Sequence, residues 1–232
     1  MYGIIWGLLL GLLPPLYGDV ENPDAIDPAV DPVGSLLETN TYAVSVLEKK
    51  NIYVEVDGTV DVDFPTALQA LQIDDLLDRI EDAWVATQNE DIYFEINQED
   101  DVTYSYIDRK GNPTKIVEIG RFFTTREDGK TQLDMLFFSE GKRFFGKFEA
   151  LSRMTAWPSD AAGKTDYTSS VYAYPKNGFS RFFARHLRLV DRFFRKETKI
   201  IEDYAADISR HIVETFDEEP DAEVSPASEP MP

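Results

Sequence analysis

Glu197 is the residue whose position most directly suggests chemistry. It falls on the apolar side of a long helical pattern that runs from Phe179 to Phe216. A carboxylate in such a place needs a polar partner, a wet cavity or a raised pKa. The partner could be the polar end of a bound ligand, or Arg121, which interrupts the apolar alternation of a predicted strand. The alternative is a bend of the helix near residues 195–196, which would leave Glu197 at the surface.

The other candidate residues in the sequence are better explained by structural roles than by catalysis or metal binding. His186 lies toward the same apolar arc, but the sequence places no acid beside it. Asp57, Asp61 and Asp63 share a strand phase and suggest calcium, yet their spacing fits no EF-hand loop and the central glycine is missing. The chain has no cysteine and two histidines, which excludes disulfides, thiol nucleophiles and histidine-rich metal centres. We therefore predict no catalytic residue, metal or cofactor.

A basic stripe repeats along the outer side of the same helical pattern. Its members recur at steps of four and three, which keeps them on one narrow face: Arg181, Arg185, Arg188, Arg192, Arg195 and Lys199. We interpret the stripe first as the solvated face of an amphipathic helix. The two alternatives are peripheral contact with an anionic membrane surface, where each basic residue adds about 1 kcal/mol, and contact with an acidic protein partner such as the chain's own tail.

The apolar side of this helix needs a partner, and the preceding sequence offers a sheet. Period-two alternation predicts strands at 51–62, 91–97, 101–108, 114–123, 132–139, 143–151 and 166–174. The links between them are short and carry turn residues, which implies antiparallel neighbours. Two short helices, at 64–71 and 74–84, follow the first strand, with Asp63 as a cap and Pro65 in the first turn.

The N-terminus carries an apolar run at 4–13, which ends at Pro14 and Pro15. This run predicts a signal sequence over residues 1–18 and export of the chain to the periplasm or the exterior. The alternatives are an uncleaved N-terminal anchor and an ordinary buried segment. A membrane span is not expected, because it would need about 20 apolar residues.

Acidic residues are concentrated in two flanks. Residues 19–39 and 217–232 carry six acids each and no base, which accounts for more than half of the net charge of -20. We interpret 19–45 as an acidic, proline-containing linker and 217–232 as a disordered acidic tail, on either side of one domain at 46–216. A chain this acidic is not expected to bind nucleic acid.

The order of strand, two short helices, antiparallel meander and long terminal helix resembles the helix-grip fold of the START-like (SRPBCC) superfamily. Residues 53–71 (YVEVDGTVDVDFPTALQAL) resemble its opening strand and first helix, 143–174 its late strands, and 178–213 its terminal helix. The resemblance implies an α+β fold. In it, a curved antiparallel sheet of about six or seven strands wraps around the long C-terminal helix, with an apolar cavity between them.

By this resemblance, ligand contacts lie on the inward faces of the sheet and of the terminal helix. The expected contacts are mostly methionine, aromatic and aliphatic side chains, with two charged groups: Arg121, Met135, Phe137, Phe144, Phe148, Met154, Trp157, Tyr172, Phe183, Leu187, Val190, Phe194 and Glu197. Plain core is the competing interpretation for each of them, because a slip of one residue reverses the face of a strand.

The resemblance and these expected contacts predict a non-enzymatic protein that holds an apolar or amphipathic small molecule, such as a lipid, between the sheet and the terminal helix. The signal sequence predicts that this protein is exported. Two alternatives stay open. One is an enzyme of cyclase or aromatase type that uses Glu197, His186 or Tyr172 for proton transfer in the same cavity. The other is a protein-interaction module whose core has closed.

Overall fold

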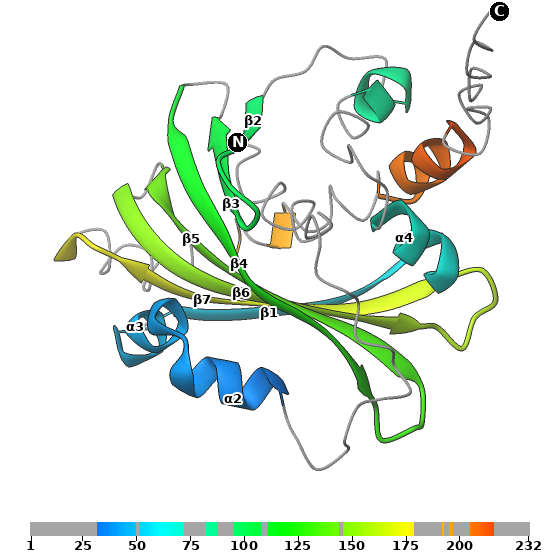
Figure 1. The fold of residues 1–232 in the computed structure, drawn as a ribbon, viewed down its shortest axis with the longest axis horizontal. Helices are drawn as coiled ribbons and strands as arrows, with labels where there is room; N and C mark the ends of the chain where they lie inside the picture. The colour runs from blue at the N-terminus through cyan, green and yellow to red at the C-terminus, as the bar shows by residue number, and fades with distance from the viewer. Residues whose placement is uncertain are drawn as a thin grey trace, which may run out of the picture.

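Seven strands form one antiparallel sheet in the computed structural model of the chain (Figure 1). In chain order they are β1 (Ile52–Val60), β2 (Glu95–Gln98), β3 (Thr103–Ile107), β4 (Pro113–Thr125), β5 (Thr131–Arg143), β6 (Gly146–Pro158) and β7 (Thr165–Pro175). Across the sheet the order is β1-β7-β6-β5-β4-β3-β2. The predicted α+β class and the antiparallel meander are therefore confirmed.

The structure describes residues 32–49, 52–71, 82–87, 95–107, 111–143, 146–178, 192, 195–196 and 205–215. The helices are α2 (Pro32–Thr39), α3 (Thr41–Lys49) and α4 (Phe64–Leu71), with further helical segments at 82–87 and 205–215. The predicted signal sequence, the acidic tail and most of the long terminal helix lie outside the described residues. Within the described ranges, no helix has the length and apolar character needed to cross a membrane.

The meander is built from hairpins whose turns the sequence specifies. Between β4 and β5, the Arg126 amide donates to the Lys130 carbonyl at 2.9 Å, and Gly129 has a φ of 80°. A positive φ favours glycine, because glycine has no Cβ to clash with the backbone. The first and last strands also pair with each other, with Ile52 opposite Ala173. The neighbour of β1 in the sheet is therefore the strand farthest from it in the sequence.

Asp63 begins α4 as the sequence predicted. Its Oδ1 accepts the backbone N–H of Thr66 at 3.0 Å, and its Oδ2 accepts the Thr66 hydroxyl at 2.7 Å. The N–H bond, followed by the hydroxyl bond, holds the pKa of Asp63 below its usual 3.8. Because these bonds need the carboxylate, the cap stabilises α4 at neutral pH.

Replacing Asp63 by alanine is expected to lower the free energy of unfolding by about 1 kcal/mol. The folded pKa lies below the unfolded value, so this contribution is present above pH 3.8 and is lost as the pH falls through the lowered value. Urea unfolding of the wild type and the variant, at pH values above 3.8 and below the lowered pKa, measures the difference in the free energy of unfolding. Asp101→Ala, at an exposed position, is the control. An equal loss in both variants would contradict the capping role.

Helices α2 and α3 occupy a region for which the sequence suggested an extended linker. Pro32 begins α2, where its fixed φ suits the first helical turn. Asn40 caps α3, because its Oδ1 accepts the amides of Tyr42 and Ala43 at 3.0 and 3.3 Å. The expectation of a linker that continues to residue 45 is therefore corrected. Apolar residues at helical spacing pack both helices on the sheet, despite the acids and prolines of the preceding segment.

The two faces of the sheet are covered by different helices, and we call them inner and outer. The inner face carries Met135 and Phe137 in one buried cluster with residues of α4, 82–87 and 205–215: Phe64, Ala70, Ala83, Trp84, Ile208 and Ile212. The outer face carries Phe138 and Leu151 and packs against α2 and α3: Leu37, Ala43, Val46 and Leu47. Figure 1 shows α2 and α3 on the opposite side of the sheet from α4 and the segment 205–215.

Candidate functional site

Four of the predicted contact residues lie together on the inner face. Met135 is opposite Met154 in the β5–β6 ladder, and Phe137 and Phe148 follow at even steps along the same two strands. Met135, Phe137 and Phe148 are buried. Met154 is half-buried between the cluster of Met135 and a second inner cluster, formed by Val54, Phe148, Ala150, Val171 and Ala173. The predicted contacts Phe144, Phe183, Leu187, Val190, Phe194 and Glu197 lie outside the residues whose side chains the structure describes.

Trp157 and Tyr172 lie on the outer face, which corrects their grouping with Met135. Residues 154 and 157 are an odd number of positions apart, so a regular strand cannot place Met154 and Trp157 on one face. Tyr172 is paired with Leu151 and packs in the outer cluster beside α3. The predicted set of contacts is therefore divided between two surfaces.

Arg121 reaches the inner face because β4 contains a bulge. The register shifts between Glu118, which is opposite Phe137, and Gly120, which is opposite Leu136. The extra residue turns both Glu118 and Arg121 inward although they are three positions apart. Gly120 is needed on the other side, because a Cβ there would meet the Phe122 ring at 2.8 Å and Leu36 of α2 at 3.3 Å.

Glu118 and Arg121 form a buried ion pair. The Arg121 Nε and Nη2 donate to the two carboxylate oxygens of Glu118, each at 3.2 Å, and the side chains are 12% and 6% exposed for Arg121 and Glu118. Burial raises the pKa of Glu118, and Arg121 only partly offsets this. Burial likewise lowers the pKa of Arg121 against the attraction of Glu118. Both directions mean that desolvation outweighs the mutual attraction.

Tyr104 completes a polar group on the inner face. It is 1% exposed, and it lies opposite Ile116, in register with the strand that carries Glu118. Burial, followed by the charge of Glu118, raises the pKa of Tyr104 to about 12. In the described parts of the chain its hydroxyl has no hydrogen-bond partner. A phenol held neutral and buried in this way is a donor available to a polar atom on the inner face.

Glu118 and Tyr104 were not among the site residues predicted from the sequence. The signal for Glu118 was present, because an acid, a glycine and a base interrupt one apolar strand within four residues (EIGR). A glycine inside a strand pattern often marks a bulge. Tyr104 carried no comparable signal, since an alternating tyrosine is common in any half-buried strand.

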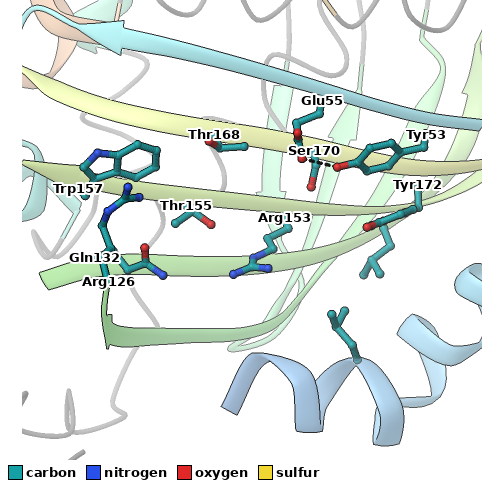
Figure 2. A pocket seen from close by; sticks show the side chains of 12 residues that line it. Tyr53, Glu55, Arg126, Gln132, Arg153, Thr155, Trp157, Thr168, Ser170 and Tyr172 are labelled. Carbon is teal, nitrogen blue, oxygen red and sulfur yellow. Dashed lines mark hydrogen bonds between the residues drawn. The ribbon is translucent and has the colours of Figure 1, made fainter. Parts of the chain in front are cut away.

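A second arrangement lies on the outer face, where a hollow of about 270 Å³ opens beside α2. Its lining comes from four strands, the β4–β5 turn and one helix: Leu37, Tyr53, Glu55, Arg126, Gln132, Leu151, Arg153, Thr155, Trp157, Thr168, Ser170 and Tyr172. Figure 2 shows Trp157 and Arg126 at one end, Tyr53 and Glu55 at the other, and threonine side chains between them. We call this the outer hollow.

Asp134 is the buried anchor of the outer hollow. It is 0% exposed, and its Oδ1 accepts the Arg153 Nε and Nη2 at 3.0 and 2.7 Å and the Thr155 hydroxyl at 2.7 Å. Its Oδ2 accepts the Thr124 hydroxyl at 2.9 Å and the Gln132 amide at 2.8 Å. These bonds fix the positions of three lining side chains from below.

Aromatic contacts define the two ends of the outer hollow. The guanidinium of Arg126 lies over Trp157, 3.9 Å from the ring centroid. At the other end the rings of Tyr53 and Tyr172 are 4.8 Å apart, and the Tyr53 hydroxyl donates to Glu55. Tyr53 is 51% exposed, so this end presents an aromatic surface to solvent.

The three aspartates considered as calcium ligands make hydrogen bonds and ion pairs within the protein instead. Asp57 accepts the Thr168 hydroxyl at 2.6 Å, Asp61 lies 3.5 Å from the Lys164 amine, and Asp63 caps α4. Among the described residues, no group of three or more His, Cys, Asp or Glu side chains is placed to hold a metal ion.

The basic stripe is described in part. Arg192 and Arg195 are exposed, whereas Arg181, Arg185, Arg188 and Lys199 lie outside the described residues, as does His186. Contact of the stripe with a membrane or an acidic partner stays a prediction.

No protein-family model matches the sequence, and no curated protein matches it. Solved structures are similar to it, and three of them are as follows. A conserved protein from Geobacillus kaustophilus is 12% identical with a TM-score of 0.41, over 71% of this chain and 97% of that one. A Deinococcus radiodurans protein is 11% identical with a TM-score of 0.30, over 67% and 98%. An uncharacterised Rhizobium leguminosarum protein is 11% identical with a TM-score of 0.28, over 71% and 99%.

Proposed function

We propose that this chain is an exported, non-enzymatic START-like protein that binds an amphipathic small molecule between the inner face of its sheet and its C-terminal helix. In this proposal the sheet adopts the helix-grip arrangement, and the apolar part of the ligand contacts Met135, Phe137 and their neighbours. The strand order and the position of α4 between β1 and β2 support the arrangement. The apolar run at 4–13 supports export.

The observation that carries the proposal is the buried hydroxyl of Tyr104, which has no hydrogen-bond partner among the residues that the structure describes. Leaving a buried donor without a partner costs about 1–3 kcal/mol, and the cost disappears when a ligand supplies an acceptor. Glu118 and Arg121 lie on the same face and contribute to the electrostatics around Tyr104. A few polar groups on an apolar wall are the usual means of orienting a small ligand.

Binding is favoured over catalysis by the positions of the described groups. The enzyme alternative relied on Glu197, His186 and Tyr172. Tyr172 lies on the outer face, away from Met135 and Tyr104. The neutral phenol of Tyr104 is suited to donating a hydrogen bond and is a weak acid at neutral pH.

Native mass spectrometry after gentle purification is expected to show a retained amphipathic molecule. With the ligand removed, calorimetric titration is expected to show binding of dodecanol and dodecanoate. Failure of the wild-type protein both to retain a ligand and to bind either probe would overturn the proposal.

Replacing Tyr104 by phenylalanine is expected to weaken dodecanol binding about fivefold, which corresponds to the loss of one neutral hydrogen bond of about 1 kcal/mol. The same change should leave the stability of the free protein unchanged or slightly higher, because the hydroxyl has no partner in the described residues. Tyr42→Phe on α3 is the matched control and should bind normally. A Tyr104→Phe variant with lower stability and normal binding would assign the hydroxyl to the core instead.

A further inference from the structure

We propose that the outer hollow is a second ligand site, which takes a small organic carboxylate with an aromatic or alicyclic body. The carboxylate lies between Arg126 and Arg153, and the apolar body lies toward Tyr53, Tyr172 and Leu37. This inference does not depend on the function proposed for the inner face, because the two sites are on opposite faces of the sheet.

Arg153 is a preorganised donor in the outer hollow. Both of its bonds to Asp134 use Nε and Nη2, and neither uses the Nη1 amino group. The Arg153 side chain is 38% exposed while Asp134 is 0% exposed, so the guanidinium is fixed from beneath and accessible from above. A guanidinium held in this way loses little conformational freedom when it binds an anion.

Arg126 supplies a second positive charge that is only loosely neutralised. Its Nε lies 3.5 Å from the Asp128 carboxylate, which is 46% exposed, and within the described residues this Nε makes no hydrogen bond. Stacking on Trp157 holds the guanidinium plane in place. Two oriented guanidiniums beside one hollow suit a planar carboxylate, which accepts paired N–H bonds.

The opposite end of the outer hollow fixes the direction of the ligand. Glu55 accepts the hydroxyl of Tyr53 there, and its negative charge would repel a carboxylate. The Tyr53–Tyr172 pair and Leu37 offer apolar and aromatic surface instead. A ligand with one anionic end and one apolar end therefore matches the hollow in a single orientation.

The size of the outer hollow limits the ligand. A volume of about 270 Å³ lies just below the range of sites for drug-sized molecules. Hydroxyl groups of Thr168 and Ser170 line the middle of the hollow and can bond further polar atoms. One ring with a short acidic side chain is the expected scale.

Ligand-observed NMR titration of the full chain with 3-(4-hydroxyphenyl)propionate tests the proposal. We expect saturable binding of this acid, and binding at least about tenfold weaker for its neutral amide, since a hydrogen bond to a charged group exceeds a neutral one by enough for that factor. Inorganic phosphate should bind weakly. Phosphate that binds as tightly as the acid would overturn the role of the tyrosine end, and equal binding of acid and amide would overturn the role of the arginines.

Variants of the two arginines separate this site from its scaffold. Arg126→Gln and Arg153→Lys are each expected to weaken binding of the acid about tenfold. Arg153→Lys keeps a positive charge beside Asp134, and circular dichroism verifies that each variant folds. Lys147→Gln, at an exposed position on β6, is the charge-matched control. Unchanged affinity in both folded arginine variants would refute the site.

The inner and outer sites respond to different changes. Tyr104→Phe should leave binding of 3-(4-hydroxyphenyl)propionate unchanged, and Arg126→Gln should leave dodecanol binding unchanged. Loss of the acid site alone would therefore not affect the function proposed for the inner face.

Discussion

Replacing Arg121 by alanine is expected to lower the free energy of unfolding by about 3–5 kcal/mol, because it leaves the buried carboxylate of Glu118 without its partner. Both side chains are nearly shielded from solvent, at 12% exposure for Arg121 and 6% for Glu118, so the carboxylate that remains is poorly solvated. Urea unfolding at neutral pH measures the loss. Lys147→Ala, at an exposed position on β6, is the control.

The double variant Glu118→Leu/Arg121→Met provides the sharper measurement. Burial outweighs attraction for both members of the pair, so replacing both by apolar residues of similar size should recover most of the stability that the single change removes. If the double variant is as unstable as Arg121→Ala, the ion pair stabilises the folded state relative to an apolar pair, and desolvation does not outweigh its attraction.

Glu118 also makes stability depend on pH. Its folded pKa lies above the usual 4.5, so the folded state holds this proton more tightly than the unfolded state. The stabilisation from this group is fully present below pH 4.5 and is lost as the pH rises through the raised value. Arg121→Ala should enlarge that loss and extend it to higher pH, because the pKa of Glu118 rises further without the guanidinium, and Glu118→Gln should remove it. Unfolding titrations across this window distinguish the two.

Replacing Asp134 by asparagine is expected to be the second largest effect, a loss of about 2–3 kcal/mol in the free energy of unfolding. The carboxylate accepts five hydrogen bonds at 0% exposure, and the new amide group would face donors. Partial exposure of Arg153, at 38%, keeps the loss below that of a fully buried pair.

The same Asp134→Asn variant should lose binding of 3-(4-hydroxyphenyl)propionate in the outer hollow, because Arg153 and Thr155 are no longer held in place. Asp160→Asn is the control, since that carboxylate is 98% exposed although it contacts Lys130. It should show no measurable change in stability or binding. Equal losses in the two variants would contradict the anchoring role of Asp134.

The sheet could be predicted from the sequence because the patterns that define its strands and turns are local in the sequence. Period-two alternation and turn residues such as Gly129 lie within a few positions of the strands they define. Helices α2 and α3 were missed because their apolar positions, including Val33 and Val46, follow an acidic, proline-containing segment that dominates the composition of the region. Their helical character becomes clear only with the outer face that receives them.

The candidate sites were harder to predict because they depend on strand phase. One extra residue in β4 places Arg121 on the inner face with Glu118, whereas an unbroken alternation would separate them. Trp157 was grouped with Met154 by the opposite error, since β6 is regular there and the odd spacing places the two residues on different faces. Asp134 looked like an ordinary surface acid in an alternating strand, since the donors that surround it come from β4, β5 and β6.

The pairing of β1 with β7 has a consequence for the chain during its synthesis. Thr59 donates to Asp166, 107 positions away, so β1 leaves the ribosome long before its partner exists. At about 5–20 residues per second the delay is roughly 5–20 s. During that time β1 is an unpaired strand, and the acids Glu55 and Asp57 on it serve as gatekeepers that discourage pairing with another chain.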